Sequence, residues 1–157
     1  MGHEAVMEFL KQRGVEFTLY RLKGDEAATV ESAARSVGCD PSMIVKNVVF
    51  VAGESAVVVL CSGDRSVDRS KLSEALGTNF RLASREEVHR LTGYVAGGVP
   101  PFNHRANIRV IADRGLLRFE EVVTSGGSTD TLIRLRTDDL LRLSGAKVLE
   151  VARPSKA

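Results

Sequence analysis

Two polar residues, Lys46 and Asn47, interrupt an apolar strand pattern over residues 44–51. Side chains alternate along a strand, so these neighbours must point to opposite faces of it. An unpaired charge is costly to bury, and Lys46 must therefore reach solvent, pair with an acid or face a polar cleft. Two interpretations stay open: a strand-end lysine that reaches solvent, and a cation that a rigid strand holds to bind an anion or polarise a carbonyl group.

A segment rich in glycine and proline, residues 92–102, is the second candidate for chemistry. Glycine permits positive φ angles and a close approach of the backbone to a ligand, whereas proline fixes φ and stiffens the chain. Successive free N–H groups in such a turn can form an anion-binding nest or an oxyanion hole. An ordinary connecting loop is the alternative. Because the two prolines carry no N–H, the candidate donors are Gly97, Gly98, Val99 and Phe102.

The sequence lacks the familiar motifs of nucleophilic and metal catalysis. Cys39 and Cys61 form no CxxC pair, which favours two reduced thiols. The three histidines stand in no motif relation to either cysteine and lack the spacing of metal ligands. No phosphate-binding glycine motif follows a predicted strand. We therefore expect no metal, no cofactor and no catalytic cysteine.

Composition limits the class of protein. A chain of 157 residues with 43% hydrophobic and 27% charged residues is typical of one globular domain, which we expect to span residues 1–157. The net charge of +2 excludes a broadly basic nucleic-acid surface but not a partner that touches one local patch. The N-terminal residues lack a secretory signal pattern, and no apolar run approaches the ~18 residues that span a bilayer. We expect a cytoplasmic protein with neither a membrane nor a DNA partner.

The elements that position these residues follow from hydrophobic periodicity and capping signals. Helices are expected at residues 4–13, 29–38, 68–76, 84–93 and 137–143, with Thr29 and Thr137 among the caps. Strands are expected at 16–22, 43–52, 55–61, 80–82, 107–112, 120–124, 131–136 and 148–151. Hairpins interrupt any regular alternation, so the pattern favours an α/β fold with a mixed, largely antiparallel, strongly curved and barrel-like sheet flanked by helices.

Several segments in a fixed order form a wider pattern. They are Thr29 to Ala34, Ile44-Val45-Lys46, Gly63-Asp64-Arg65, Leu91 to Tyr94, Gly97 to Pro101, Ser125-Gly126-Gly127 and Asp138-Asp139-Leu140. Together they resemble the YbaK/ProX family of aminoacyl-tRNA deacylases, which is also the editing domain inserted in bacterial prolyl-tRNA synthetases. The resemblance spans residues 15–145, nearly the whole chain.

The resemblance implies a hydrolase that acts in trans on the ester between a mismatched amino acid and the 3′-terminal adenosine of tRNA. Several members act on tRNA for proline that carries alanine or cysteine. Loop N–H groups would hold the aminoacyl carbonyl or the 3′ end, and the lysine would fix the same region by its charge. A vicinal ribose hydroxyl or a water would attack, so no protein nucleophile is implied. The implied catalytic residues are Lys46, Gly98, Val99 and Pro101.

The resemblance also implies a small substrate pocket. Tyr20 stands where cysteine-specific relatives carry a tyrosine, and Asn47 follows the lysine as in some alanine-specific relatives. Leu132 takes the place of an aspartate of the cysteine-specific relatives, so the amino-acid specificity stays open. The implied substrate-binding residues are Tyr20, Thr29, Asn47, Gly97, Pro100, Phe102, Ser125, Gly126 and Gly127.

The implied partners are the aminoacylated 3′ end of tRNA and, as an optional helper, an aminoacyl-tRNA synthetase. Two alternatives stay open: a non-catalytic module that binds aminoacyl-tRNA or a synthetase, and a hydrolase of small aminoacyl or nucleotide esters. Arginines that flank the glycine–proline segment are candidates for contact with the acceptor stem, or else belong to a solvated face. They are Arg81, Arg85, Arg90 and Arg105.

Overall fold

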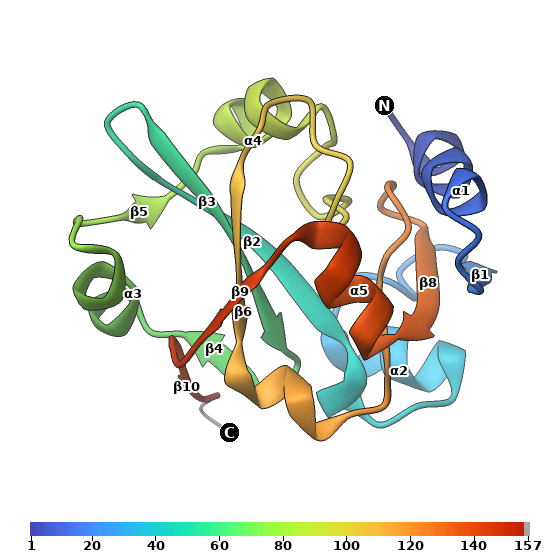
Figure 1. The fold of residues 1–157 in the computed structure, drawn as a ribbon. Coiled ribbons are helices and arrows are strands. Elements are labelled where there is room, and N and C mark those ends of the chain that lie inside the picture. The colour runs from blue at the N-terminus through green and yellow to red at the C-terminus, as the bar shows by residue number, and fades with distance from the viewer. Residues whose placement is uncertain (156–157) are drawn as a thin grey trace.

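The computed structural model describes residues 1–155 (Figure 1). Its α-helices are α1 (His3–Gln12), α2 (Val30–Val37), α3 (Arg69–Leu76), α4 (Arg85–Thr92) and α5 (Thr137–Ser144). Its strands are β1 (Thr18–Arg21), β2 (Val45–Ala52), β3 (Ser55–Ser62), β4 (Arg65–Val67), β5 (Arg81–Leu82), β6 (Arg109–Asp113), β7 (Glu121–Ser125), β8 (Thr131–Arg136), β9 (Lys147–Leu149) and β10 (Ala152–Pro154). Two 3-10 turns, η1 (Pro41–Met43) and η2 (Arg114–Arg118), complete the set. No helix in this part of the chain is both long and apolar enough to cross a bilayer.

The strands form one large mixed sheet, one antiparallel sheet and one short pair. The large sheet has the order β5-β2-β3-β6-β9, with β2 antiparallel to both neighbours and β3, β6 and β9 parallel. The second sheet, β1-β8-β7, is antiparallel and meets the start of β2 through a bridge between Ile44 and Val123. These findings confirm the mixed α/β fold. The sheet expected to be barrel-like is not closed within residues 1–155, since the five-stranded sheet ends at β5 on one edge and at β9 on the other.

The central hairpin of β2 and β3 divides the core (Figure 1). Val45, Val49 and Val51 belong to the larger apolar cluster, whereas Phe50 belongs to a separate cluster on the other side. This confirms the alternation predicted from the sequence, because odd-numbered and even-numbered residues of β2 face different clusters. Lys46 and Asn47 are therefore held on opposite faces of a strand that is anchored on both sides.

Capping signals identified most helix starts correctly. The Thr29 hydroxyl accepts the Ser32 N–H at 3.0 Å, which begins α2 with a complete capping box. The prediction for the last helix was wrong in detail. Thr137 is its first helical residue and does not cap it, because its hydroxyl donates to the Phe119 carbonyl at 2.6 Å.

Candidate functional site

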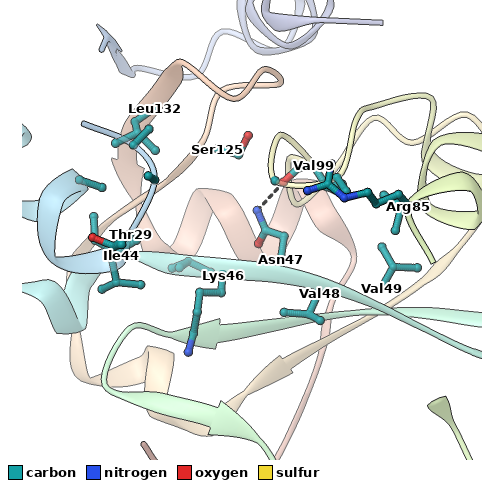
Figure 2. Close-up of a pocket in the computed structure, with 18 of the residues that line it drawn as sticks. Thr29, Ile44, Lys46, Asn47, Val48, Val49, Arg85, Val99, Ser125 and Leu132 are labelled. Atoms are coloured by element: carbon teal, nitrogen blue, oxygen red, sulfur yellow. Dashed lines mark hydrogen bonds between the residues drawn. The ribbon is translucent and has the colours of Figure 1, made fainter. Parts of the chain in front are cut away.

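A cavity of about 540 Å³ lies along β2 (Figure 2). Its walls come from β2, the start of α2, the start of α4, the glycine–proline segment, the end of β7 and the start of β8. The structure thus brings segments together that are far apart in the sequence. The predicted site residues that line this cavity are Thr29, Lys46, Asn47, Gly97, Val99 and Ser125.

Asn47 connects the strand to the glycine–proline segment. Its side-chain nitrogen donates to the Val99 carbonyl at 2.9 Å and to the Thr124 hydroxyl at 2.7 Å. Thr124 in turn donates to the Val45 carbonyl at 3.1 Å, so its oxygen is the acceptor for Asn47. A carbonyl can only accept, and both contacts therefore fix which amide atom of Asn47 is nitrogen.

The same geometry leaves one acceptor of Asn47 unused. Its Oδ1 atom is buried and has no hydrogen-bond partner among residues 1–155. A buried polar atom without a partner is costly, so such an atom beside a cavity is well suited to a ligand that donates to it. Asn47 is one of the residues that line the cavity, so this unpaired acceptor belongs to the cavity wall.

Lys46 lies on the other side of the strand from this acceptor. Figure 2 shows its side chain pointing away from Asn47 and Val99. Its ammonium group donates to the Arg65 carbonyl oxygen on β4. Arg65 itself lies 3.3 Å from the carboxylate of Asp113, whose side chain is only 1% exposed. The structure therefore does not bring the amine of Lys46 to the glycine–proline loop, although Lys46 borders the cavity as part of β2.

The two glycines of the loop have different functions. Gly97 has φ of +88°, a conformation that glycine adopts without strain. Gly98 donates its N–H to the Val95 carbonyl at 2.9 Å, which removes that N–H from the predicted set of free donors. A Cβ atom on Gly98 would lie 2.9 Å from the carbonyl carbon of Ser128, so a side chain there would collide with the second glycine-rich turn. Within residues 1–155, the N–H groups of Gly97 and Val99 have no hydrogen-bond acceptor.

The residues after Val99 hold the loop in place and do not line the cavity. The ring Nε2 of His104 lies 2.7 Å from the Pro100 carbonyl and donates to it. Burial lowers the pKa of His104 below its usual value, which keeps the ring neutral. Phe102 is buried and stacks on Phe9 with ring centroids 5.0 Å apart. Pro101 is also buried.

Three further predicted contacts also lie outside the cavity lining. Tyr20 packs on a cluster that includes Ile44 and Leu132. Gly126 lies against Thr131, and Gly127 lies against α1, where a Cβ atom would approach the Gly2 carbonyl oxygen to 2.9 Å. The glycine-rich turn therefore supports the loop from behind, and its glycines are needed for close packing.

The sequence did not single out two residues that the geometry makes important. Thr124 links Asn47 to the backbone of β2, and His104 holds the loop through the Pro100 carbonyl. The signal for Thr124 was a hydroxyl at the end of an apolar strand, directly before the glycine-rich turn.

The cysteines have the chemistry of structural residues. Cys61 is fully buried, and burial raises the pKa of its thiol to about 11. Burial also raises the pKa of Cys39. Both groups are therefore protonated thiols at neutral pH, and a protonated thiol is a poor nucleophile.

Comparison with known proteins identifies the family to which this chain belongs. The family model of the aminoacyl-tRNA editing domain matches residues 25–143. The multifunctional Ser/Thr-tRNA deacylase ProXp-y of Escherichia coli (strain K12) is 28% identical over 155 residues, which cover 96% of this chain and 93% of that protein. The proline–tRNA ligase of Aquifex aeolicus (strain VF5) is 38% identical over 104 residues, which cover 65% of this chain but 18% of the ligase.

The fold agrees with this assignment. A crystal structure described as a candidate trans-editing enzyme for prolyl-tRNA synthetase has a TM-score of 0.90 and 34% sequence identity to this chain, and the match covers 96% of both chains. The resemblance to the YbaK/ProX family is thereby confirmed, and so is the fold that it implied. The chain belongs to the aminoacyl-tRNA editing domain family and is an aminoacyl-tRNA deacylase.

Proposed function

We propose that this chain acts in trans, in the cytoplasm, and hydrolyses the ester between a small mismatched amino acid and the 3′-terminal adenosine of tRNA. The observation that carries the proposal is that Asn47, which holds the Val99 carbonyl, keeps an unpaired Oδ1, while the N–H of Val99 in the same cavity wall is also free. An aminoacyl ester carries an ammonium donor on the carbon next to its carbonyl acceptor. One fixed acceptor and one nearby donor in the cavity match these two groups.

The proposed reaction uses these groups for orientation and electrostatic stabilisation. Asn47 Oδ1 accepts a hydrogen bond from the α-ammonium group, and the N–H groups of Gly97 and Val99 stabilise the carbonyl oxygen as negative charge develops on it. Water adds to the carbonyl carbon, the bond to the ribose oxygen breaks, and that oxygen takes up a proton. The Thr29 hydroxyl in the cavity wall is engaged in capping α2. The attacking group is therefore a water, or a ribose hydroxyl of the substrate that acts with it.

We assign Lys46 a positioning role. The family resemblance makes it a functional residue, while its ammonium group reaches the Arg65 carbonyl on the face opposite Asn47. This contact joins β2 to β4 at the position next to Asn47. By anchoring β2 to β4, Lys46 would thus hold Asn47, its neighbour on the same strand, in position. Gly98 and Pro101 have the same kind of role for Val99, because they pack the loop from behind.

The cavity wall near α2 favours a short side chain without strong polarity. Ala33, Ile44 and Leu132 supply apolar surface there. The Thr29 hydroxyl is already used by the capping box, and Ser125 accepts the Gly127 N–H at 3.1 Å. We therefore propose alanine or cysteine, attached to tRNA for proline, as the first substrates to test. Serine and threonine, which the name of the E. coli relative specifies, are the competing candidates.

A deacylation panel tests the proposal. The wild-type protein is incubated with tRNAs charged with alanine, cysteine, serine, threonine or proline, with and without a prolyl-tRNA synthetase. Asn47→Ala should lower kcat/KM by about 10- to 100-fold, because a hydrogen bond to a charged group contributes ~1.5–3 kcal/mol. The matched control is Asn79→Ala, which removes an exposed asparagine outside the cavity.

Other outcomes select the alternatives. Retention of aminoacyl-tRNA without release of any amino acid would support a non-catalytic binding module. Cleavage of an aminoacyl-adenosine as fast as of the full tRNA would support a hydrolase of small esters.

A further inference from the structure

Arg85 is the first residue of α4 and stands at the edge of the cavity. Figure 2 shows its side chain extending from α4 in the direction of Val99, and both residues line the cavity. The residue is exposed to solvent. Among residues 1–155, no carboxylate lies within ion-pair distance of its guanidinium group, and that group makes no hydrogen bond within the chain. Arg85 is thus an exposed cation at the edge of the cavity, without a partner among the described residues.

Its neighbour Arg81 differs in this respect. Arg81 binds Glu87 with two parallel hydrogen bonds, both 2.9 Å long. This pairing holds the pKa of the Glu87 carboxyl at about 2. The charge of Arg81 is therefore already neutralised by a partner on α4, whereas the charge of Arg85 is free to act on a ligand.

The cavity lining adds a second observation. Arg85 and Lys46 are the charged residues of the lining, no acidic residue belongs to it, and the amine of Lys46 is turned to the other face of β2. Next to Arg85, the side chain of Leu82 is 60% exposed at the same rim. A bare cation beside an exposed apolar side chain matches a nucleotide, which presents a phosphate and a flat apolar base.

We propose that Arg85 binds the phosphate of the 3′-terminal nucleotide of tRNA while Leu82 contacts its sugar or base. The inference rests on the proposed function, since it assumes that the aminoacyl ester lies between Asn47 and Val99. The phosphate of the same nucleotide then lies toward the cavity mouth, where the guanidinium can bind two of its oxygens. The exposure of Arg85 argues against contact between its side chain and the ester. In the proposed reaction the loop N–H groups already bind the carbonyl oxygen of that ester.

The test compares Arg85→Gln with its matched control Arg81→Gln, which removes the same charge four positions away. Two substrates are used: full-length aminoacyl-tRNA and an aminoacyl-adenosine that has no phosphate. Arg85→Gln should lower kcat/KM on the tRNA by about 10-fold or more and leave the aminoacyl-adenosine unaffected. It should also reduce the slope of log kcat/KM against log salt by ~0.7, the value for one phosphate contact of a single strand. Arg81→Gln should change neither quantity.

A binding measurement separates this inference from the proposed function. The affinity of wild type and Arg85→Gln for an uncharged RNA hairpin that ends in CCA does not depend on hydrolysis. A loss of affinity in Arg85→Gln supports the phosphate contact even where the wild type cleaves no ester, in which case only the proposed function fails. Equal affinity of the two proteins for the hairpin, or an equal loss of activity on both substrates, would overturn the role of Arg85.

Discussion

The side chain of Asn47 donates a 2.9 Å hydrogen bond to the carbonyl of Val99, 52 positions later in the chain. This bond joins β2 to the glycine–proline loop at the centre of the cavity. The second donor hydrogen of Asn47 goes to Thr124 on β7, so one amide group connects three segments. It also fixes the direction of the free Oδ1 acceptor.

Asn47→Asp should separate the loop from the strand. A carboxylate keeps the shape of the amide but cannot donate, so it would face the Val99 carbonyl with like partial charge. We expect the free energy of unfolding to fall by ~1–3 kcal/mol and deacylation to be lost, as measured by urea denaturation and by ester cleavage. Asn79→Asp is the surface control. An Asn47→Asp protein with wild-type stability and activity would contradict the assigned contact.

Gly98→Ala should displace the loop from the second glycine-rich turn. The new methyl group would lie 2.9 Å from a backbone carbon of Ser128, and the backbone there must move to accept it. We expect a loss of ~1–3 kcal/mol in thermal or urea unfolding, together with a lower kcat. Gly24→Asn serves as control, because position 24 has a positive φ of +56° that asparagine tolerates, and open space around it. Equal stability of the two variants would count against the close packing at Gly98.

His104 should make the stability of the loop depend on pH. Burial lowers the pKa of the folded-state ring below the usual ~6.5, so below this pH the unfolded chain binds a proton more readily than the folded chain. The stabilisation is therefore complete above pH ~6.5 and is lost as the pH falls through the folded pKa. His104→Gln should lose less unfolding free energy than wild type between pH ~7.5 and ~5. The exposed His89→Gln should follow the wild-type curve, and parallel curves for all three proteins would refute the assignment.

Lys46 variants distinguish a positioning role from a role of its charge. Lys46→Met removes both charge and donor, and we expect it to lower kcat/KM by about 10-fold or more. Lys46→Gln keeps a donor for the Arg65 carbonyl without the charge, and it should recover part of the lost activity. Deacylation rates and melting temperatures of both variants provide the measurement. Equal inactivity of the two variants at unchanged melting temperature would instead assign the function to the positive charge.

Leu132→Ala should enlarge the cavity and change the amino-acid preference. Leu132 is 8% exposed and forms part of the wall near α2. Hydrophobic pockets discriminate by ~1–3 kcal/mol per methylene, so the ratio of kcat/KM for a larger amino acid over alanine should rise by about 10-fold or more. Leu117→Ala, at a position that is 55% exposed, is the control for an exposed leucine. An unchanged ratio would exclude Leu132 from the specificity wall.

Much of the fold could be predicted because local signals and tertiary structure agree. Alternation along β2 correctly assigned its two faces, and the capping box at Thr29 correctly placed the start of α2. The short strands β4 and β10 were missed, because three residues are too few to show a period. β4 matters here, since its Arg65 carbonyl receives the amine of Lys46.

The sequence predicted which segments form the candidate site but not how their individual groups are arranged. Motif order identified the right loop and strand, but it could not show which groups of the loop face the cavity. Gly98 donates its N–H to Val95 within the turn, and Phe102 stacks on Phe9, a residue far away in the sequence. The orientation of the Asn47 amide likewise depends on Thr124 and Val99, which accept both of its hydrogens.

Thr29 limits how this enzyme can be redesigned. It lines the cavity, yet its hydroxyl also begins α2, and replacing a threonine cap costs ~0.5–2 kcal/mol. A substitution at this position that removes the side-chain oxygen would therefore lower stability as well as change the cavity wall, whereas serine, asparagine or aspartate would keep a cap. Ala33 and Leu132 also line the cavity and cap no helix, but both belong to a buried apolar cluster, so libraries at these positions should be limited to apolar side chains of similar volume.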